Sequence, residues 1–366
     1  MKFKYNLKWP HLVAAVIILI AIIAICLPEA QNSAEDKNEP QITPSPYLTP
    51  VNEEDAPDQM NTVAYYQDDN GYLVPVMRSI GAEEGIARAT LNLMIKSVYN
   101  DMEAARMGLR CVIPENTTFD LDISGGTARV DMSKEALNSP DAVSEFNMVS
   151  AIVQTLTDFP TVERVKFLID GKETQRLPFG TGISGEFTRG YMNLESTDIN
   201  DPDSTVTLYF TGESPSMIVP VTRAVYGKGD IQTAVMELVK GPGSLSPLNS
   251  VIPSGCGLKS VRVEDGVAYV DFTRDFISIA EESDGGRMAL RALVLTCMQF
   301  EGVKSVKVLV EGEEYDTGNG TLAKPTFVNS ASDIQDAFIR KRQKISLSLN
   351  SEREIYKWKS REKQMK

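Results

Sequence analysis

Hydrophobic and polar positions in the second half of the chain follow first a strand period and then a helix period. Residues 205–210 and 217–223 are short segments rich in β-branched and aromatic side chains, bounded by glycine and proline, which predicts two strands. Asp230 is then suited to cap a helix, and Gly241-Pro242 to end it. Between them one helical face is apolar, and it consists of Ile231, Val235, Leu238 and Val239.

The remainder of this half predicts a hairpin, a second helix and a closing strand. Residues 258–263 and 267–272 are joined by Glu264-Asp265-Gly266, a sequence typical of a tight turn. Residues 306–310 alternate as a last strand. One face of the second helix is expected to carry Ala289, Ala292, Leu293, Thr296 and Phe300. The predicted order is therefore β-α-β-β-α-β.

The first half of the chain repeats this order. Its first helix is expected to bury Leu91, Met94, Ile95 and Val98, and its second Phe146, Val149, Val153 and Leu156. Four short landmarks of the first half recur in the second half at offsets of 139–145 residues. Val74-Pro75-Val76-Met77-Arg78 recurs as Val219-Pro220-Val221-Thr222-Arg223, and Ile113-Pro114 recurs as Ile252-Pro253. Val130-Asp131 recurs as Val270-Asp271, and Asp170-Gly171 recurs as Glu311-Gly312. Because solenoid repeats span only about 20–50 residues, a period of this length indicates a duplicated domain.

The fold class is therefore α+β, with two tandem copies of a small two-layer β-α-β-β-α-β domain. We assign residues 61–180 to the first domain, 181–204 to a linker and 205–328 to the second domain. The two copies should superpose, with helices on one sheet face and the other face open. Pro75 should coincide with Pro220, Pro114 with Pro253, Asp131 with Asp271, and Gly171 with Gly312. Buried together in the second copy we expect Ile231, Val235, Leu238 and Leu293.

Both ends of the chain differ from this body. Residues 12–27 are sixteen consecutive apolar residues behind three lysines, so residues 1–28 predict an export signal or membrane anchor. An uncleaved anchor, a cleaved signal peptide and a lipoprotein signal ending at Cys26 all remain open, although Ile25 is atypical before a lipidated cysteine. Residues 29–60 predict a disordered acidic, proline-rich tether. Residues 329–366 predict a basic tail, either disordered or in contact with a membrane surface or an anionic polymer.

Charge and rare residues exclude several functions. The net charge is −13, and the ten basic residues that follow from Arg340 make the rest more acidic still, which argues against nucleic-acid binding. His11 is the only histidine and lies outside both repeats, so histidine catalysis and histidine metal sites are excluded there. Cys111 and Cys256 are not at equivalent positions, so we expect buried free thiols rather than a disulfide framework.

The duplicated carboxylates are the remaining candidates for chemistry. A hydrolase could pair Asp131 with Glu135 and Asp271 with Asp275, provided that a concave site raises the pKa of one member. An aspartate followed by Ser or Thr at a strand end more often caps a turn. We therefore assign no catalytic, cofactor-binding or metal-binding residue.

Taken in order, the landmarks resemble the GerMN domain of GerM-like sporulation and spore-germination proteins. That domain has a helix ending in Leu-x-x-Gly-Pro, an Ile-Pro, a strand ending in Val-Asp-x-Ser/Thr and an acidic-Gly turn. In this chain the helix end corresponds to Leu238–Pro242, and the Ile-Pro to Ile113-Pro114 and Ile252-Pro253. The strand end corresponds to Val130–Ser133 and Val270–Thr273, and the acidic-Gly turn to Asp170-Gly171 and Glu311-Gly312. The first copy lacks the Gly-Pro.

The resemblance implies ring-building-motif-like domains without enzymatic activity or cofactor. It also implies an extracytoplasmic role that supports the channel complex joining mother cell and forespore. The expected partners are other sporulation envelope proteins or further copies of this chain, with residues 12–27 in the cell membrane. The prolines Pro75 and Pro220, which mark edge strands, indicate where such assembly could occur. The alternative is a module that binds peptidoglycan, with the tail from Arg340 as its contact.

Overall fold

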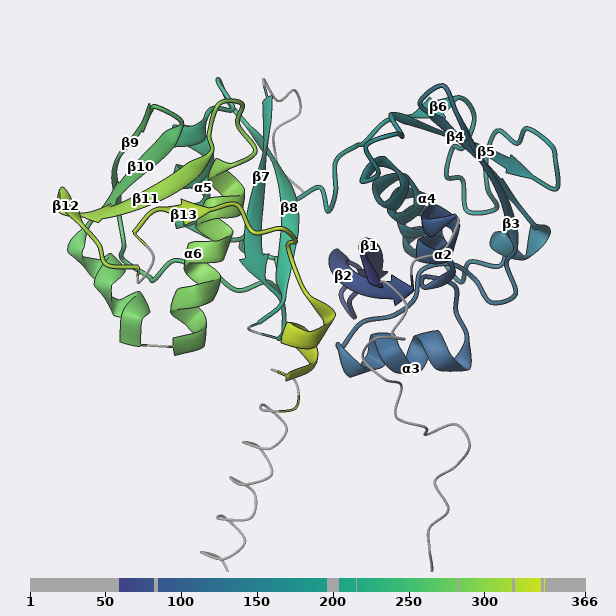
Figure 1. The fold of residues 1–366 in the computed structure, drawn as a ribbon, viewed down its shortest axis with the longest axis horizontal. Coiled ribbons are helices and arrows are strands. Elements are labelled where there is room, and N and C mark those ends of the chain that lie inside the picture. The colour runs from purple at the N-terminus through teal and green to yellow at the C-terminus, as the bar shows by residue number, and fades with distance from the viewer. Residues whose placement is uncertain are drawn as a thin grey trace, which may run out of the picture. The chain divides into compact units, whose positions relative to one another are not determined.

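The computed structural model describes residues 59–81, 85–195, 204–214, 216–281, 283–317 and 320–336, together with residue 339. The first copy starts with a hairpin and ends in a sheet that contains a helical crossover (Figure 1). Its elements are β1 (Gln59–Gln67), β2 (Leu73–Gly81), α2 (Ile86–Asn92), α3 (Val98–Arg106), β3 (Phe119–Ser124), β4 (Thr127–Met132), η2 (Lys134–Leu137), α4 (Ala142–Thr157), β5 (Arg164–Ile169) and β6 (Glu186–Phe187).

The second copy has the same order of elements, except that its described residues form no counterpart of α3 and that two short strands rather than one follow its closing strand. They are β7 (Ser204–Thr211), β8 (Ile218–Val225), α5 (Ile231–Lys240), β9 (Leu258–Glu264), β10 (Val267–Phe272), η3 (Arg274–Glu281), α6 (Ser283–Cys297), β11 (Ser305–Val310), β12 (Glu313–Glu314) and β13 (Leu322–Ala323). All the described residues of both copies belong to one compact unit.

The strand pairing confirms that the two copies share one fold. Pro75 pairs with Tyr65 across β1 and β2, and Pro220 pairs with Tyr209 across β7 and β8. In both copies the second hairpin is antiparallel and the closing strand joins it in parallel. The second hairpin turns on two residues of positive φ, Gly125-Gly126 in one copy and Asp265-Gly266 in the other, as a type I′ turn requires.

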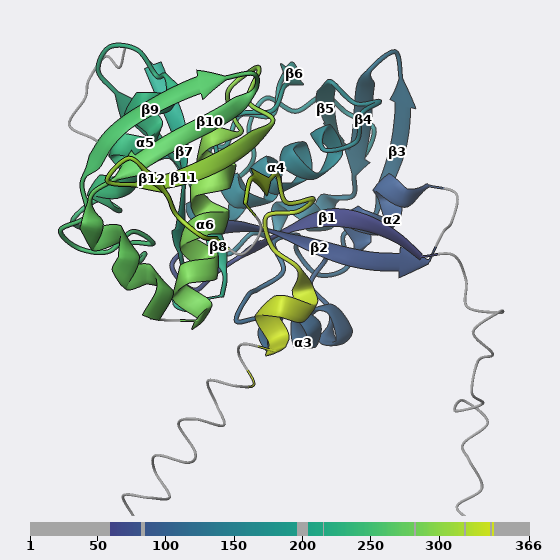
Figure 2. The ribbon, with the colours of Figure 1, turned by 60° about the vertical axis from the view of Figure 1, so that its left-hand side comes forward.

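Each copy has three layers, so the predicted two-layer arrangement is wrong. The first hairpin of each copy is a separate two-stranded sheet, and the long helix of each copy, α4 or α6, lies between it and the larger sheet (Figures 1 and 2). Contacts on both sides explain the burial of α4 and α6. Residues 151–156 of α4 and residues 292–297 of α6 are buried without interruption, which a helix covered on one face cannot achieve.

Most of the predicted core residues are buried, but six are not, and three of these, Ile95, Val239 and Phe300, are half-buried against the core. Val235, Leu238 and Leu293 are fully buried, whereas Ile231 is half-buried at the first turn of α5. Val98 is 91% exposed, because α2 ends at Asn92 and Val98 begins the separate helix α3. Phe146 is 58% exposed, because it lies on the outer side of α4 although its neighbours Glu145 and Asn147 are buried.

The large sheets leave their outer faces open, as predicted. Ala128, Val130 and Met132 of β4 point into the core, while Arg129 between them is exposed. The predicted linker contributes structure of its own, since β6 pairs with β5 and Ile183 is buried.

Several predictions concern residues outside the described part of the chain. These are the membrane segment at residues 12–27, the tether at 29–60 apart from its last two residues, which begin β1, and most of the basic tail. Among the described residues no helix is long and apolar enough to cross a bilayer. The same residues contain no group of three or more Cys, Asp or Glu side chains suited to hold a metal ion.

Candidate functional site: the junction between the copies

The edge strands that carry Pro75 and Pro220 face each other across the junction. Asn193, in the predicted linker, accepts a hydrogen bond from the Leu73 N–H of β2 at 2.7 Å and donates to the Leu73 carbonyl at 2.7 Å. Its amide also donates to the Pro220 carbonyl of β8 at 2.7 Å. One asparagine side chain therefore joins the two hairpins.

Asn329, which follows the second copy, makes the matching set of bonds. It accepts from the Ile218 N–H at 2.8 Å and donates to the Ile218 carbonyl at 2.7 Å and the Pro75 carbonyl at 2.9 Å. Only 4% of Asn329 is exposed, so these bonds are shielded from water. Residues 192–195 also pair with β8 at Thr222, and residues 329–330 pair with β2 at Met77, so both proline-bearing edges are partly covered within the chain rather than left open.

A polar triad around the buried Tyr65 attaches the linker to the first copy. Arg189 contacts the Asp158 carboxylate at 2.5 Å and donates to the Tyr65 hydroxyl at 2.9 Å. That hydroxyl donates to Asp158 at 2.8 Å. Burial is the main reason why the pKa of Tyr65 lies well above its usual value, so Tyr65 stays a neutral donor.

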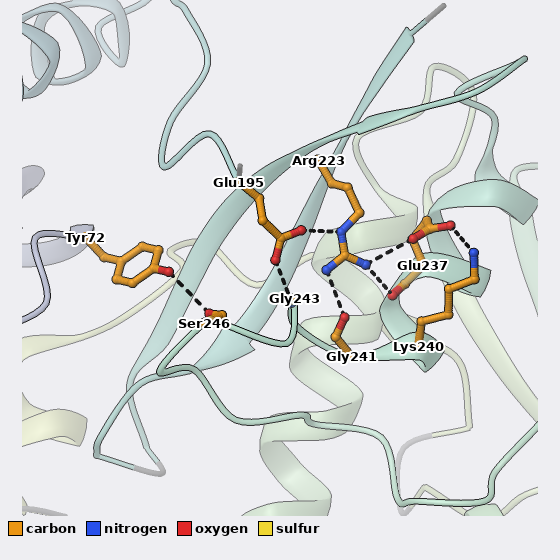
Figure 3. A network of polar contacts seen from close by, with 8 residues as sticks. All are labelled: Tyr72, Glu195, Arg223, Glu237, Lys240, Gly241, Gly243 and Ser246. Atoms are coloured by element: carbon orange, nitrogen blue, oxygen red, sulfur yellow. Dashed lines mark hydrogen bonds and ion pairs between the residues drawn. The ribbon is translucent and has the colours of Figure 1, made fainter. Parts of the chain in front are cut away.

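Arg223 of β8 attaches the linker to the second copy (Figure 3). It donates to the Glu195 carboxylate, to Glu237 of α5 at 3.0 Å and to the Gly241 carbonyl at 2.8 Å. Burial by itself lowers the pKa of Arg223, but the hydrogen bonds and charges of Glu195 and Glu237 outweigh that effect and raise it. The second oxygen of Glu195 accepts from the Gly243 N–H at 2.7 Å. The linker thereby fixes the loop that follows α5.

Arg78 holds the equivalent place in the first copy. Its guanidinium lies over the Tyr66 ring at 6.0 Å, as that of Arg223 lies over Phe210 at 5.7 Å. Its acidic partner is Glu103, at 3.7 Å. Because Glu103 belongs to α3, the inserted helix supplies the carboxylate that α5 supplies in the second copy.

An uncharged groove lies where the first copy, the linker and the loop after α5 meet. Its volume is about 880 Å³, within the range of ligand pockets. The described residues that line it include no Asp, Glu, Lys or Arg. Large apolar side chains stand exposed along it: Phe146 at 58%, Tyr191 at 63%, Leu194 at 62% and Leu245 at 98%.

The amide side chains in this groove are engaged within the chain. Asn147 donates to the Gly71 carbonyl at 2.8 Å, and Gln154 donates to the Gly190 carbonyl at 2.9 Å. Nearby, the buried Glu145 accepts from the N–H groups of Phe179 and Thr181 at 2.8 and 2.9 Å. These bonds fix the walls, so the groove offers mainly apolar contacts to an occupant.

The duplicated aspartates serve the fold. Asp131 accepts a hydrogen bond from the Gly171 N–H at 2.8 Å, and Asp271 accepts one from the Gly312 N–H at 3.0 Å. Both glycines have positive φ, and so do the acidic residues before them. Each aspartate thus ties the end of one strand to the turn that leaves its parallel neighbour, which agrees with the capping interpretation.

Their proposed catalytic partners lack the environment that a hydrolase needs. A hydrogen bond from Ser133 lowers the pKa of Glu135, opposite to the shift required of a general acid. Asp275 is exposed at the start of η3. Neither pair lines the uncharged groove.

The thiols agree with the prediction of buried free cysteines. Cys111, Cys256 and Cys297 are free and buried. Burial raises the pKa of Cys111 and Cys297 to about 12 and that of Cys256 to about 11, so they remain protonated and unreactive at neutral pH.

The sequence did contain a signal for one part of the junction. The arginine that ends Val-Pro-Val-x-Arg is duplicated as Arg78 and Arg223, and a duplicated arginine inside an apolar strand predicts a buried ion pair. No comparable signal pointed to Asn193 or Asn329, because both lie outside the four landmarks.

Comparison with known proteins places these observations in a family. The model of the Germane family, described as "Sporulation and spore germination", matches residues 63–175 and 207–316. The chain is 32% identical over 286 residues to the spore germination protein GerM of Bacillus subtilis (strain 168). This alignment covers 73% of this chain and 78% of that protein.

A solved structure shows the same arrangement of tandem domains. The tandem GerMN domains of the sporulation protein GerM from Bacillus subtilis align with a TM-score of 0.63 and 29% sequence identity. The alignment covers 75% of this chain and 99% of that one.

Proposed function

Because this chain belongs to the Germane family of sporulation and spore germination proteins, we propose that it is a non-enzymatic, membrane-tethered envelope protein that supports the channel complex between mother cell and forespore. The observation that carries the non-enzymatic part of this proposal is the hydrogen bonding of the duplicated aspartates Asp131 and Asp271. Both accept the same backbone hydrogen bond in a strand-end turn, so the most enzyme-like feature of the sequence has a structural role.

The role is tested in an endospore-forming host that carries this gene. Deletion should block development after engulfment, and the full chain supplied in trans should restore spore yield. Normal spore yield and germination in the deletion strain would contradict the proposed role.

The non-enzymatic part of the proposal has a separate test. Glu135→Gln and Asp275→Asn remove the exposed partner of each duplicated aspartate without touching the bonds to Gly171 and Gly312. A chain carrying both changes should complement the deletion fully. Failure of this stable variant to complement would favour a hydrolase.

The membrane tether is tested by replacing residues 1–28 with a cleavable signal peptide. The released chain should be exported but should fail to complement, whereas a chain with an unrelated membrane anchor should complement.

Binding to the cell wall through the basic tail is the alternative. Ile334 is fully buried, so a deletion that tests the tail has to begin at Arg340 rather than earlier. Salt-sensitive sedimentation of the full chain with wall sacculi, abolished by deleting residues 340–366, would support this alternative.

A further inference from the structure

Helix α3 directs an apolar stripe toward solvent. Val98, Met102 and Ala105 recur at i, i+4 and i+7, the spacing of one helix face, and all three are exposed. Tyr99 beside them is 64% exposed, whereas Ala104 is the buried residue of the helix. Such a stripe normally faces the core of its own domain.

The rest of α3 holds this stripe in a fixed orientation. Ser97 caps the first turn by accepting from the Asn100 N–H at 3.1 Å. Glu103 contacts Arg106 at 2.5 Å and Arg78 of β2 at 3.7 Å. A preorganised helix loses less conformational entropy on binding than a disordered segment does.

We propose that α3 of one chain docks in the uncharged groove of a second copy of this chain. Amphipathic helices bind apolar grooves through residues spaced in this way. The groove supplies Phe146, Leu194 and Leu245 as contacts for the stripe. Neither the three stripe positions nor the groove lining carries a charge.

A second copy is the occupant that these surfaces fit, because each chain carries both an exposed apolar stripe and an uncharged groove. Identical chains with a net charge of −13 repel one another, so a contact between them is least opposed where both surfaces are uncharged. The stripe and the groove are different surfaces, so the contact is head-to-tail. Each pair of chains therefore keeps one stripe and one groove unoccupied. This contact gives a surface to the expected association with further copies of this chain, and it rests on the proposed sporulation role only for its biological setting.

The test uses the full chain in a non-ionic detergent. Sedimentation velocity over a series from ~1 μM to ~1 mM should show concentration-dependent association, as expected of a weak contact. Met102→Glu in the stripe, and Phe146→Glu or Leu245→Glu in the groove, should each weaken association at least tenfold. The matched controls Ile277→Glu and Tyr226→Glu change side chains that are 46% and 70% exposed elsewhere, and should have no such effect.

Mixing the variants gives the decisive result. A Met102→Glu chain keeps its groove and a Phe146→Glu chain keeps its stripe, so the mixture should form 1:1 dimers that neither variant forms alone. A monomeric wild type, undiminished association of the variants, or a mixture without dimers would overturn the contact. Each of these outcomes leaves the sporulation role to its own genetic test, and a failure of that test leaves the measured association standing.

Discussion

One hydrogen bond recurs at the end of the central strand of each copy, from a glycine N–H to the aspartates Asp131 and Asp271. The sequence predicted that these residues would turn the chain, because short polar side chains at strand ends usually bond a nearby backbone group. The partner could not be predicted, since Gly312 lies 41 residues from Asp271 and reaches it only through the parallel pairing of β10 and β11.

Removing this bond should destabilise the second copy. Asp271 is only 9% exposed, so Asp271→Ala should lower the free energy of unfolding by about 1–3 kcal/mol, the usual net contribution of a hydrogen bond to a charged group. Asp271→Asn keeps an acceptor oxygen and should cost less. Chemical denaturation measures both, with the exposed Asp275→Ala as control. Equal stability of the Ala variant and the wild type would contradict this role.

At the scale of elements, the helix stripes were predictable but the second covered face of each long helix was not. Periodicity detects a face only where its residues are apolar. In α4 the additional buried positions mix apolar residues, such as Met148 and Ile152, with polar ones, among them Glu145, Asn147 and Gln154. Hydrogen bonds to the backbone at Gly71, Phe179, Thr181 and Gly190 compensate for their burial. The second covered face of α4 therefore mixes polar with apolar residues, so it did not form a separate apolar stripe in the sequence.

The helix caps Asp141 and Asp230 should make the free energy of unfolding depend on pH in the acidic range. A hydrogen bond from the Ser144 N–H lowers the pKa of Asp141, and one from the Thr233 N–H lowers that of Asp230. A carboxyl whose pKa is lower in the folded state stabilises above its unfolded pKa of ~3.9, and the stabilisation is lost as the pH falls through the folded pKa.

The double variant Asp141→Asn/Asp230→Asn keeps a capping oxygen but does not titrate. Its free energy of unfolding should fall less steeply than that of the wild type as the pH is lowered from ~5 to ~2. Unfolding measured across this range tests the prediction, with the exposed Asp122→Asn as control. An unchanged slope would show that the caps contribute nothing to acid sensitivity.

For the whole molecule, the sequence predicted two equivalent copies but not the way they meet. Asparagine in a linker usually indicates a turn, and Asn193 does have a positive φ of 53°. Its bonds to Leu73 and Pro220 depend on two strands that approach only in the assembled molecule. Nothing local in the sequence predicts such a contact.

The two asparagines can be separated by amide hydrogen exchange. Asn329→Ala removes the acceptor of the Ile218 N–H, whereas the Leu73 N–H keeps its bond to Asn193. Losing ~1–3 kcal/mol of protection should speed exchange at Ile218 by about tenfold or more.

Leu73 is the internal control in that experiment, and Asn193→Ala should reverse the pattern. If Asn329→Ala accelerated both amides equally, the junction would open as one unit rather than bond by bond.

The match between the two asparagines has a consequence for the history of the chain. Leu73 corresponds to Ile218 and Pro75 to Pro220, so exchanging the copies turns the bonds of Asn193 into those of Asn329. Two identical chains related by a two-fold axis would make the same set. The molecule is organised as a homodimer fused into one gene product. Fusion releases the halves from having to stay identical, and α3, present in one half alone, is the asymmetry that this freedom permits.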